Sequence, residues 1–273
     1  MISTSLSPFA LILRCWDYRA LVFALIRQDV VGRYKGSVLG VLWSFFNPVF
    51  MLAVYTFVFS VVFKARWNVI QGESRFEFAL LLFTGLLIFN LFAECINRAP
   101  SLILQNTTYV KKVVFPLEIL PLVVLGAAFF HTLINLVVLL MFSIFVFGIP
   151  PVTVFEFPLL LVPLFSICLA GSWVLASLGV YLRDVAQVVA VLVTALMFLT
   201  PIFYPVTAVP EKYQTILYLN PLTFLVDQGR GVLIFGNHID PIGYIKLTST
   251  ALVAAWLGLV WFQKTRRGFA DVL

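Results

Sequence analysis

Long apolar segments are the feature that most constrains how this chain can fold. An α-helix needs about 20 mostly apolar residues to cross the hydrocarbon core of a bilayer. Six segments approach or exceed that length, at residues 40–63, 78–104, 117–147, 157–182, 185–204 and 244–262, although the second spans only if its helix continues toward residue 104. A water-soluble fold cannot bury so much apolar surface, because 62% of the residues are hydrophobic and only 11% are charged, against about 25% charged in soluble domains. We therefore expect an all-α integral membrane protein with six transmembrane helices.

The distribution of basic residues orients these six segments. Lysine and arginine accumulate in short cytoplasmic loops. With both termini inside, 12 of the 18 basic residues are cytoplasmic and six are outside, whereas the 12 acidic residues divide into six and six, so the whole net charge of +6 is cytoplasmic. The first 15 residues lack an apolar core long enough for a signal peptide. We therefore expect a multi-pass protein with both termini in the cytoplasm.

The segment ahead of the first span, residues 16–34, has the pattern of an amphipathic helix. Its apolar side chains fall on one helical face and its polar side chains on the others, and the apolar set is Leu21, Val22, Leu25, Ile26 and Val30. Such a helix can lie flat in the inner membrane interface, or it can pack as a cytoplasmic helix on the protein itself. The pattern leaves both alternatives open.

Two further helices are predicted between the fifth and sixth spans, at residues 211–219 and 221–235, and both are too short to cross a bilayer. Asn220 and Pro221 begin the second helix, since asparagine is a good helix cap and proline suits the first helical position. The two helices can re-enter the outer leaflet and shield the exit of a conduit. Alternatively, they form a plain hairpin on the periplasmic surface.

The sequence contains no motif for hydrolysing ATP. The phosphate-binding pattern G-x-x-x-x-G-K-[ST] is absent, so another chain must hydrolyse ATP if ATP drives this protein. The two histidines, His131 and His238, have no acidic or cysteine neighbour at metal-ligand spacing. We predict no catalytic residue, no bound metal and no cofactor.

His131 and Asn135 share one face of the third span, where they can join helices by hydrogen bonds or serve a function within the membrane.

The predicted cytoplasmic loop between the second and third spans, residues 105–116, combines two cations with an apolar ridge. Its central residues are Tyr109, Val110, Lys111, Lys112, Val113, Val114 and Phe115, and Pro116 ends it. Topology alone requires only the lysines and leaves the apolar residues unexplained. We therefore favour a docking segment for a soluble partner over a purely topological role.

Aromatic side chains recur at helical spacing along two spans. They are Trp43, Phe46, Phe50 and Phe57 in the first span and Phe198, Phe203 and Tyr204 late in the fifth. Such rings can line a conduit and bind the apolar faces of sugars. In most membrane helices they face lipid or neighbouring helices, so the spacing alone does not select the rings that line a channel.

A series of motifs resembles the permeases of type-2 ABC exporters. The stretch from Arg33 to Pro48 follows the pattern R-Y-x-x-S-x-L-G-x-x-W-x-x-x-x-P at the start of the first span. The similarity continues in order along nearly the whole chain, through Lys111-Lys112, Phe115-Pro116-Leu117-Glu118, Arg183-Asp184, Pro201-Ile202-Phe203-Tyr204-Pro205 and Asn220-Pro221-Leu222, leading to Arg230.

This resemblance implies the membrane subunit of an ATP-driven exporter of lipid-linked polysaccharide in the bacterial inner membrane, not an enzyme. O-antigen is the expected cargo, with capsule or teichoic acid, or a small amphiphile or drug, as alternatives. An intramembrane acyl- or glycosyltransferase is a rival from another class. The resemblance also implies a homodimer that forms a continuous channel, with two copies of a separate ATPase that binds ATP and Mg.

The resemblance further implies roles for individual residues within one transmembrane domain, residues 1–273. Residues 109–115 would contact the ATPase, together with Arg27, Arg33 and Tyr34 of the interface helix. The seven aromatic residues of the first and fifth spans would guide the sugar chain. The periplasmic gate would contain Tyr213, Tyr218, Asn220, Pro221 and Arg230.

Overall fold

The computed structural model describes residues 16–58, 76–111 and 115–273, and these residues form helices and connections without any strand. The all-α prediction is confirmed for this part of the chain. Three members of the predicted docking segment, Lys112, Val113 and Val114, lie outside the described residues.

Five helical segments are long and apolar enough to cross a membrane. They are Gly40–Val58, Glu77–Gln105, Leu117–Phe147, Val152–Tyr181 and Pro241–Val272. Their main helices are α3 (Trp43–Tyr55), α4 (Glu77–Arg98), α7 (Leu120–Phe147), α8 (Phe157–Tyr181) and α12 (Pro241–Thr265). These segments correspond to the first four predicted spans and to the sixth. The second does continue past residue 104, through α5 (Leu102–Gln105).

The fifth predicted span, residues 185–204, forms a shorter helix than expected. Its helix α9 (Val185–Leu199) has 15 residues, a length of about 22 Å against the ~30 Å of a hydrocarbon core. The helix stops because Thr200, with ψ 135°, is extended ahead of Pro201, and proline disfavours helical backbone at the preceding residue. A sixth crossing therefore stays a prediction.

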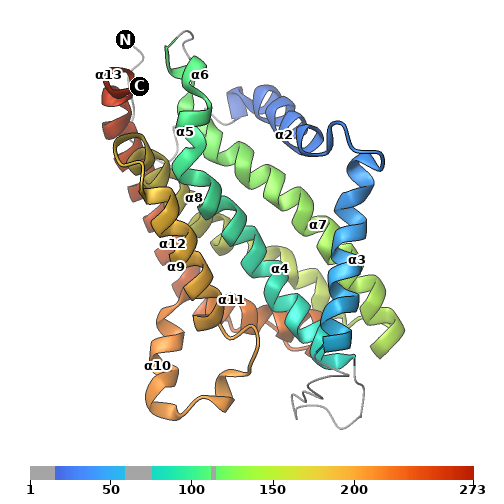
Figure 1. Cartoon of the computed structure of the whole chain (residues 1–273). Coiled ribbons are helices and arrows are strands. Elements are labelled where there is room, and N and C mark those ends of the chain that lie inside the picture. Colours follow the sequence, from blue (N-terminus) through green and yellow to red (C-terminus); the bar gives the residue numbers. More distant parts are fainter. Residues whose placement is uncertain (1–15, 59–75, 112–114) are drawn as a thin grey trace.

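Helix α4 is the central element of the bundle (Figure 1). It packs against α7, α8, α9 and α11 (Pro221–Arg230), and Ala79, Leu80 and Leu81 have no exposed surface. Helices α8 and α12 approach closely because Gly258 lies against the backbone of Ala170, where a β-carbon would come within 2.7 Å of the carbonyl oxygen. Small residues permit such close contacts between membrane helices.

The two ends of the bundle carry different short elements. Helices α2 (Arg19–Tyr34), α6 (Thr107–Lys111) and α13 (Phe269–Val272) gather at the end that also holds the C-terminus, and α10 (Glu211–Leu219) lies at the opposite end (Figure 1). Between α2 and α3 the chain turns sharply at Gly36 and Gly40, whose φ angles of 87° and 51° favour glycine. The predicted topology requires this grouping of α2, α6 and the C-terminus on one side.

Helix α2 lies across the end of the bundle and packs its apolar face on the protein (Figure 1). Val30 is buried, and Ile26 lies against Gly126 of α7 so closely that a β-carbon there would overlap it. Phe23 and Val31 of α2 remain exposed. The apolar stripe therefore serves internal packing, as in the second alternative above, while the exposed residues suit contact with a membrane interface.

Candidate functional site

A charged network fastens α2 to α4. Asp29 of α2 accepts two hydrogen bonds from Arg98 of α4, at 2.7 and 2.8 Å. One turn further along α2, Arg33 Nη2 donates to Glu94 Oε1 at 2.5 Å. Glu94 and Arg98 belong to the second span, where ionisable side chains are costly unless they are paired. Each of them forms an ion pair with a residue of α2, so the two positive and two negative charges cancel.

His131 of α7 joins the same network. Its Nδ1 lies 3.4 Å from Glu94 Oε2, and its Nε2 lies 3.2 Å from the hydroxyl of Tyr34. Nδ1 also lies 3.4 Å from Arg33 Nη1. With a proton on Nδ1 the ring donates to the carboxylate and Nε2 accepts from the Tyr34 hydroxyl, whereas an unprotonated Nδ1 accepts from Arg33. His131 thus has the interhelical bonding role that the sequence left open. Arg33 and Tyr34, expected at the ATPase interface, bond to Glu94 and His131, although the Arg33 side chain remains 38% exposed; their contact with the ATPase stays a prediction.

A polar cavity of about 370 Å³ opens beside this network, between α2, α3, α4 and α7. Its volume falls in the range of ~300–1,000 Å³ that is usual for small-molecule sites. The network side of its wall comprises Arg33, Tyr34, Glu94 and His131, and the other lining residues are Trp43, Ser44, Asn47, Pro48 and Asn135. The cavity therefore adjoins the first ring of the aromatic stripe predicted to line a conduit.

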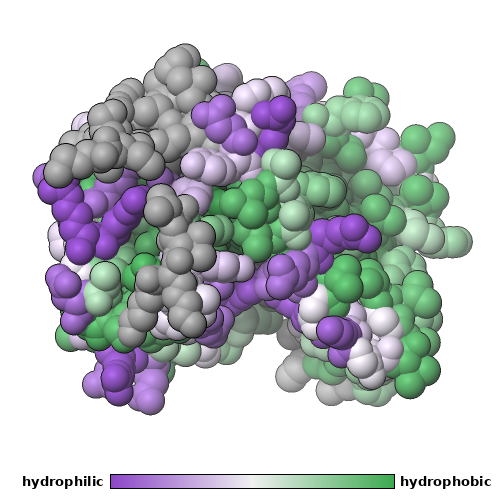
Figure 2. Space-filling model, turned by 90° about the horizontal axis from the view of Figure 1, so that it is seen from above, coloured by the Kyte–Doolittle hydropathy of each residue, from purple (hydrophilic) through white to green (hydrophobic). Residues whose placement is uncertain are grey.

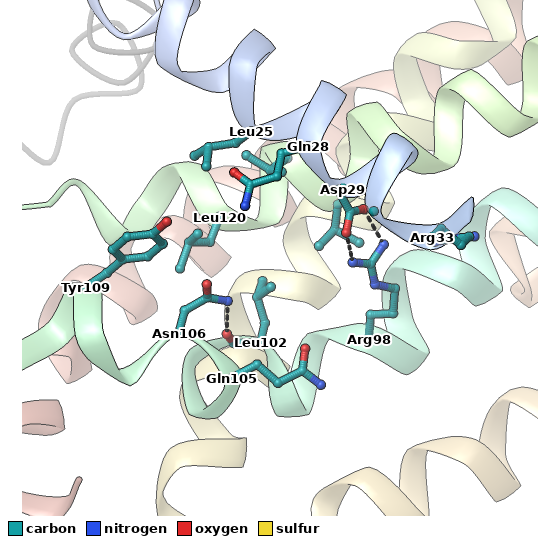
Figure 3. Close-up of a pocket in the computed structure, with 13 residues that line it drawn as sticks. Leu25, Gln28, Asp29, Arg33, Arg98, Leu102, Gln105, Asn106, Tyr109 and Leu120 are labelled. Carbon is teal, nitrogen blue, oxygen red and sulfur yellow. Dashed lines mark hydrogen bonds and ion pairs between the residues drawn. The ribbon is translucent and has the colours of Figure 1, made fainter. Parts of the chain in front are cut away.

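A second cavity, of about 560 Å³, separates α2 from the predicted docking segment (Figure 3). Gln28 of α2 and Tyr109 of α6 lie on opposite sides of it, and the Asp29–Arg98 pair closes one end (Figure 3). The interface helix and the docking segment thus share one concave surface at this end of the bundle.

The described part of the docking segment is partly internal. Tyr109 stacks on Phe115 with ring centroids 4.4 Å apart and planes 10° apart, and both rings pack against a buried cluster that includes Leu102 and Leu117. The apolar ridge therefore has a packing role that the sequence did not reveal. The remaining described members of the predicted ATPase interface are Val110, which is half-buried, Lys111 at the end of α6, and Arg27, which is exposed on α2.

The aromatic residues of α3 and of the helical turn that follows it form an exposed stripe within the segment Gly40–Val58. Trp43, Phe46, Phe50 and Phe57 each expose between 47% and 66% of their surface, and their spacing places them on one side of the helix. Such a large apolar surface, left uncovered by the described residues, is suited to contact with lipid or with another protein.

The aromatic residues near the end of α9 form a small cluster of their own. Phe203 stacks on Phe198 with ring centroids 5.7 Å apart, and the hydroxyl of Tyr204 donates to the carbonyl of Phe198 at 3.0 Å. Phe198 remains 60% exposed. Helices α3 and α9 lie on opposite flanks of α4 (Figure 1), so one chain does not bring the two aromatic groups together.

Arg230, predicted to belong to a gate, is a buried anchor in this structure. Its side chain is 3% exposed and donates to the carbonyl oxygens of Leu81, Pro201 and Ile202 at 3.0, 2.7 and 2.6 Å. Burial lowers its pKa to about 10, so the guanidinium group stays protonated at neutral pH. Arg230 thereby ties α11 to α4 and to the connection that follows α9.

The other predicted gate residues lie on or between the two short helices. Both helices exist, as α10 and α11, although residues 231–235 form a π-helical turn after α11. Asn220 caps α11, since its side chain accepts from the amide of Leu222 at 3.0 Å, and Pro221 occupies the first helical position. Tyr213 and Tyr218 are exposed on α10. Entry of these helices into the membrane stays a prediction.

The end of the molecule that carries α2 and α6 has an uneven surface. Seen from this end, hydrophilic residues gather across the left and middle of the view, and hydrophobic residues dominate the right side, where α3 lies (Figure 2). A hydrophilic surface beside the two cavities is suited to contact with a water-soluble protein.

A family comparison decides the class of this protein. The sequence profile of the ABC-2 type transporter family matches residues 20–234. The chain belongs to the ABC-2 type transporter family. As an ABC-2 membrane component it is a multi-pass transport protein rather than an enzyme, and ABC transporters of this kind work with an ATPase subunit.

Named relatives of this ABC-2 protein align over almost their whole length. The O-antigen export system permease protein RfbA of Myxococcus xanthus is 27% identical over 263 residues, which are 96% of this chain and 98% of the relative. An RfbA permease of Klebsiella pneumoniae is 28% identical over 256 residues, 93% of this chain and 95% of its own. The polysialic acid transport protein KpsM of Escherichia coli is 24% identical over 250 residues, 90% and 93% of the two chains.

Sequence reasoning missed several residues of the site in this ABC-2 protein. Asp29, Glu94 and Arg98 were not singled out, although charges four residues apart inside an apolar span are a signal of an intramembrane network. A second missed pair is Arg266 and Glu118, which lie 2.5 Å apart and connect the end of α12 to the start of α7. No local pattern reveals that pair, because its members are 148 residues apart.

Proposed function

We propose that this ABC-2 protein is the membrane-spanning subunit of an exporter that carries lipid-linked O-antigen polysaccharide across the bacterial inner membrane. The observation that carries the proposal is the similarity, over more than nine-tenths of the chain, to permeases named for O-antigen export. The exposed aromatic stripe of α3 supports a carbohydrate cargo, because aromatic faces can bind the apolar faces of sugar rings while leaving hydroxyl groups free.

Two copies of the chain would enclose the conduit. Within one chain, the rings of α3 and those near the end of α9 lie on opposite flanks (Figure 1). A symmetric dimer can bring α3 of one copy beside α9 of its partner. It would also cover the stripe of Trp43, Phe46, Phe50 and Phe57, which the chain itself leaves exposed.

The ATPase would dock at the end formed by α2 and α6, which we assign to the cytoplasm together with both termini. This assignment follows from the excess of basic residues predicted on that side and from the hydrophilic surface there (Figure 2). Two copies of the partner would bind ATP and Mg. A displacement of the segment at residues 109–115 would reach α2 across the cavity lined by Gln28 and Tyr109. From α2 it would reach α4 and α7 through the charged network.

At the opposite end, α10 and α11 would shield the exit of the conduit as short re-entrant helices. Arg230 holds α11 on α4, so movement of α4 would be transmitted to this cover. The sugar chain would pass along rings that bind it weakly, since a conduit must bind its cargo enough to admit it and little enough to release it.

Deletion of the gene in its native host tests this proposal. We expect surface O-antigen to disappear and its lipid-linked precursor to accumulate inside, with both restored by the intact gene. Normal surface O-antigen would refute the proposal. The similarity to KpsM favours capsular polysaccharide as a second candidate, so both surface glycans are measured. Loss of neither glycan, with altered sensitivity to amphiphilic drugs, would indicate a small amphiphile as cargo.

A further inference from the structure

The polar cavity beside the charged network contains hydrogen-bonding groups that its own network does not use. Asn47 of α3 and Asn135 of α7 both line it. Within the part of the chain that the structure describes, neither amide takes part in a hydrogen bond. Both residues belong to membrane-spanning segments, where a polar group without a partner costs free energy. Two amides that face one cavity can bind the same ligand.

The charge of the cavity wall argues for a neutral ligand. Arg33 is paired with Glu94, and the neighbouring Arg98 is paired with Asp29. The four charges cancel, and the Glu94 carboxylate is itself part of the wall. A phosphate group would meet this carboxylate and would compete for guanidinium groups that already have partners. A neutral, hydroxylated ligand avoids both penalties, because hydroxyl groups donate as well as accept.

Trp43 supplies the flat apolar surface that such a ligand needs. It lines the cavity one helical turn before Asn47 on α3, so that the indole and the amide face the same space. The ring is 47% exposed and available for stacking. An aromatic face beside side-chain amides matches a sugar ring, whose C–H groups form one apolar face and whose hydroxyl groups project from its edge.

We propose that this cavity is a binding site for a neutral sugar unit of the exported chain, at the end of the aromatic stripe nearest α2. Trp43 stacks on the sugar ring, and Asn47 and Asn135 hydrogen-bond to its hydroxyl groups. Arg33, Glu94 and His131 hold the opposite wall in place. The inference rests on the proposed function, because it assigns one step of glycan passage to named residues.

Photo-crosslinking in living cells tests the contact directly. The photoreactive residue p-benzoylphenylalanine replaces Asn47 or Asn135 in the complete transporter, and Val137 provides the control position. Val137 is half exposed and lines a neighbouring apolar pocket, whose lining shares only Ser44 with the polar cavity. We expect an antibody against the surface glycan to detect a crosslinked ladder at positions 47 and 135 but not at position 137. Absence of the ladder at 47 and 135, or equal ladders at all three positions, would overturn the proposal.

Substitution of the amides provides the second readout. Asn47→Leu and Asn135→Leu keep the number and branching of the side-chain heavy atoms and remove the hydrogen bonds, so we expect roughly fivefold slower export for each when precursor is limiting. Asn97→Leu is the matched control, since Asn97 is an exposed asparagine of α4 that does not line the cavity. All three variants should retain normal membrane abundance and ATPase co-purification.

The two proposals fail in different ways. If deletion of the gene removes the surface glycan but Asn47→Leu and Asn135→Leu export at the rate of the Asn97→Leu control, the sugar site is refuted and the exporter function stands. If deletion leaves the surface glycan unchanged, the proposed function itself is refuted.

Discussion

Replacement of Arg230 by methionine tests how α11 is held on the bundle. The change keeps an apolar stem of similar length and removes the donors to the carbonyl groups of Leu81, Pro201 and Ile202. The carbonyl groups of Pro201 and Ile202 lose their donor, at a cost of about 1–3 kcal/mol each, whereas the Leu81 carbonyl lies inside α4 and keeps its helical backbone bond. Part of this loss is offset because a guanidinium group, which is costly to bury, is no longer desolvated. We expect a net loss of about 3 kcal/mol in the free energy of unfolding.

For a chain of this size, 1 kcal/mol corresponds to about 2–4 °C in the midpoint of thermal unfolding. Arg230→Met should therefore lower the Tm of the purified protein by about 6–12 °C. Arg230→Lys should have an intermediate Tm, because its ammonium group has three donors but lacks the planar fork. Arg267→Met is the control, since Arg267 is exposed. A Tm for Arg230→Met within about 2 °C of the wild type would refute the anchoring role.

Two further predictions concern the end that carries α2 and α6. Lys111→Glu should weaken co-purification of the ATPase while the permease stays folded, because it reverses a charge in the docking segment and leaves the stacked Tyr109 and Phe115 in place; unchanged recovery of the ATPase would contradict that segment's role. Asp29→Arg should lower the Tm by about 2–4 °C, as expected for about 1 kcal/mol from a partly exposed ion pair, and the reversed pair Asp29→Arg with Arg98→Asp should restore most of it. A double variant no more stable than Asp29→Arg alone would show that the pair does not hold α2.

The helices of this protein were largely predictable because the length of an apolar run determines whether a helix can span a bilayer. The same rule gave the wrong end for α9, since residues 200–204 are apolar enough to extend the helix but Pro201 does not permit it. The cap at Asn220 was predictable from two adjacent residues, because helix caps depend on local geometry.

The candidate site was less predictable because its contacts join distant parts of the chain. Arg33 and Glu94 are 61 residues apart, and Asp29 and Arg98 are 69 residues apart. The sequence pointed to His131 as an intramembrane polar residue, but only the structure identifies its partners. Similarly, the spacing of the aromatic residues predicted two stripes but carried no information on which flank each occupies.

Chemical crosslinking between two copies tests the central claim, which is that α3 of one copy and α9 of its partner enclose the conduit. The native cysteines, three in the sequence, are replaced by alanine, and two differently tagged chains are co-expressed, one with Phe50→Cys and the other with Phe198→Cys. We expect a bismaleimide to link the two tagged chains into a mixed dimer. Accumulation of the transported substrate should change the yield of this crosslinked dimer. Failure to form the mixed dimer, or a link between positions 50 and 198 within a single chain that carries both substitutions, would contradict the account.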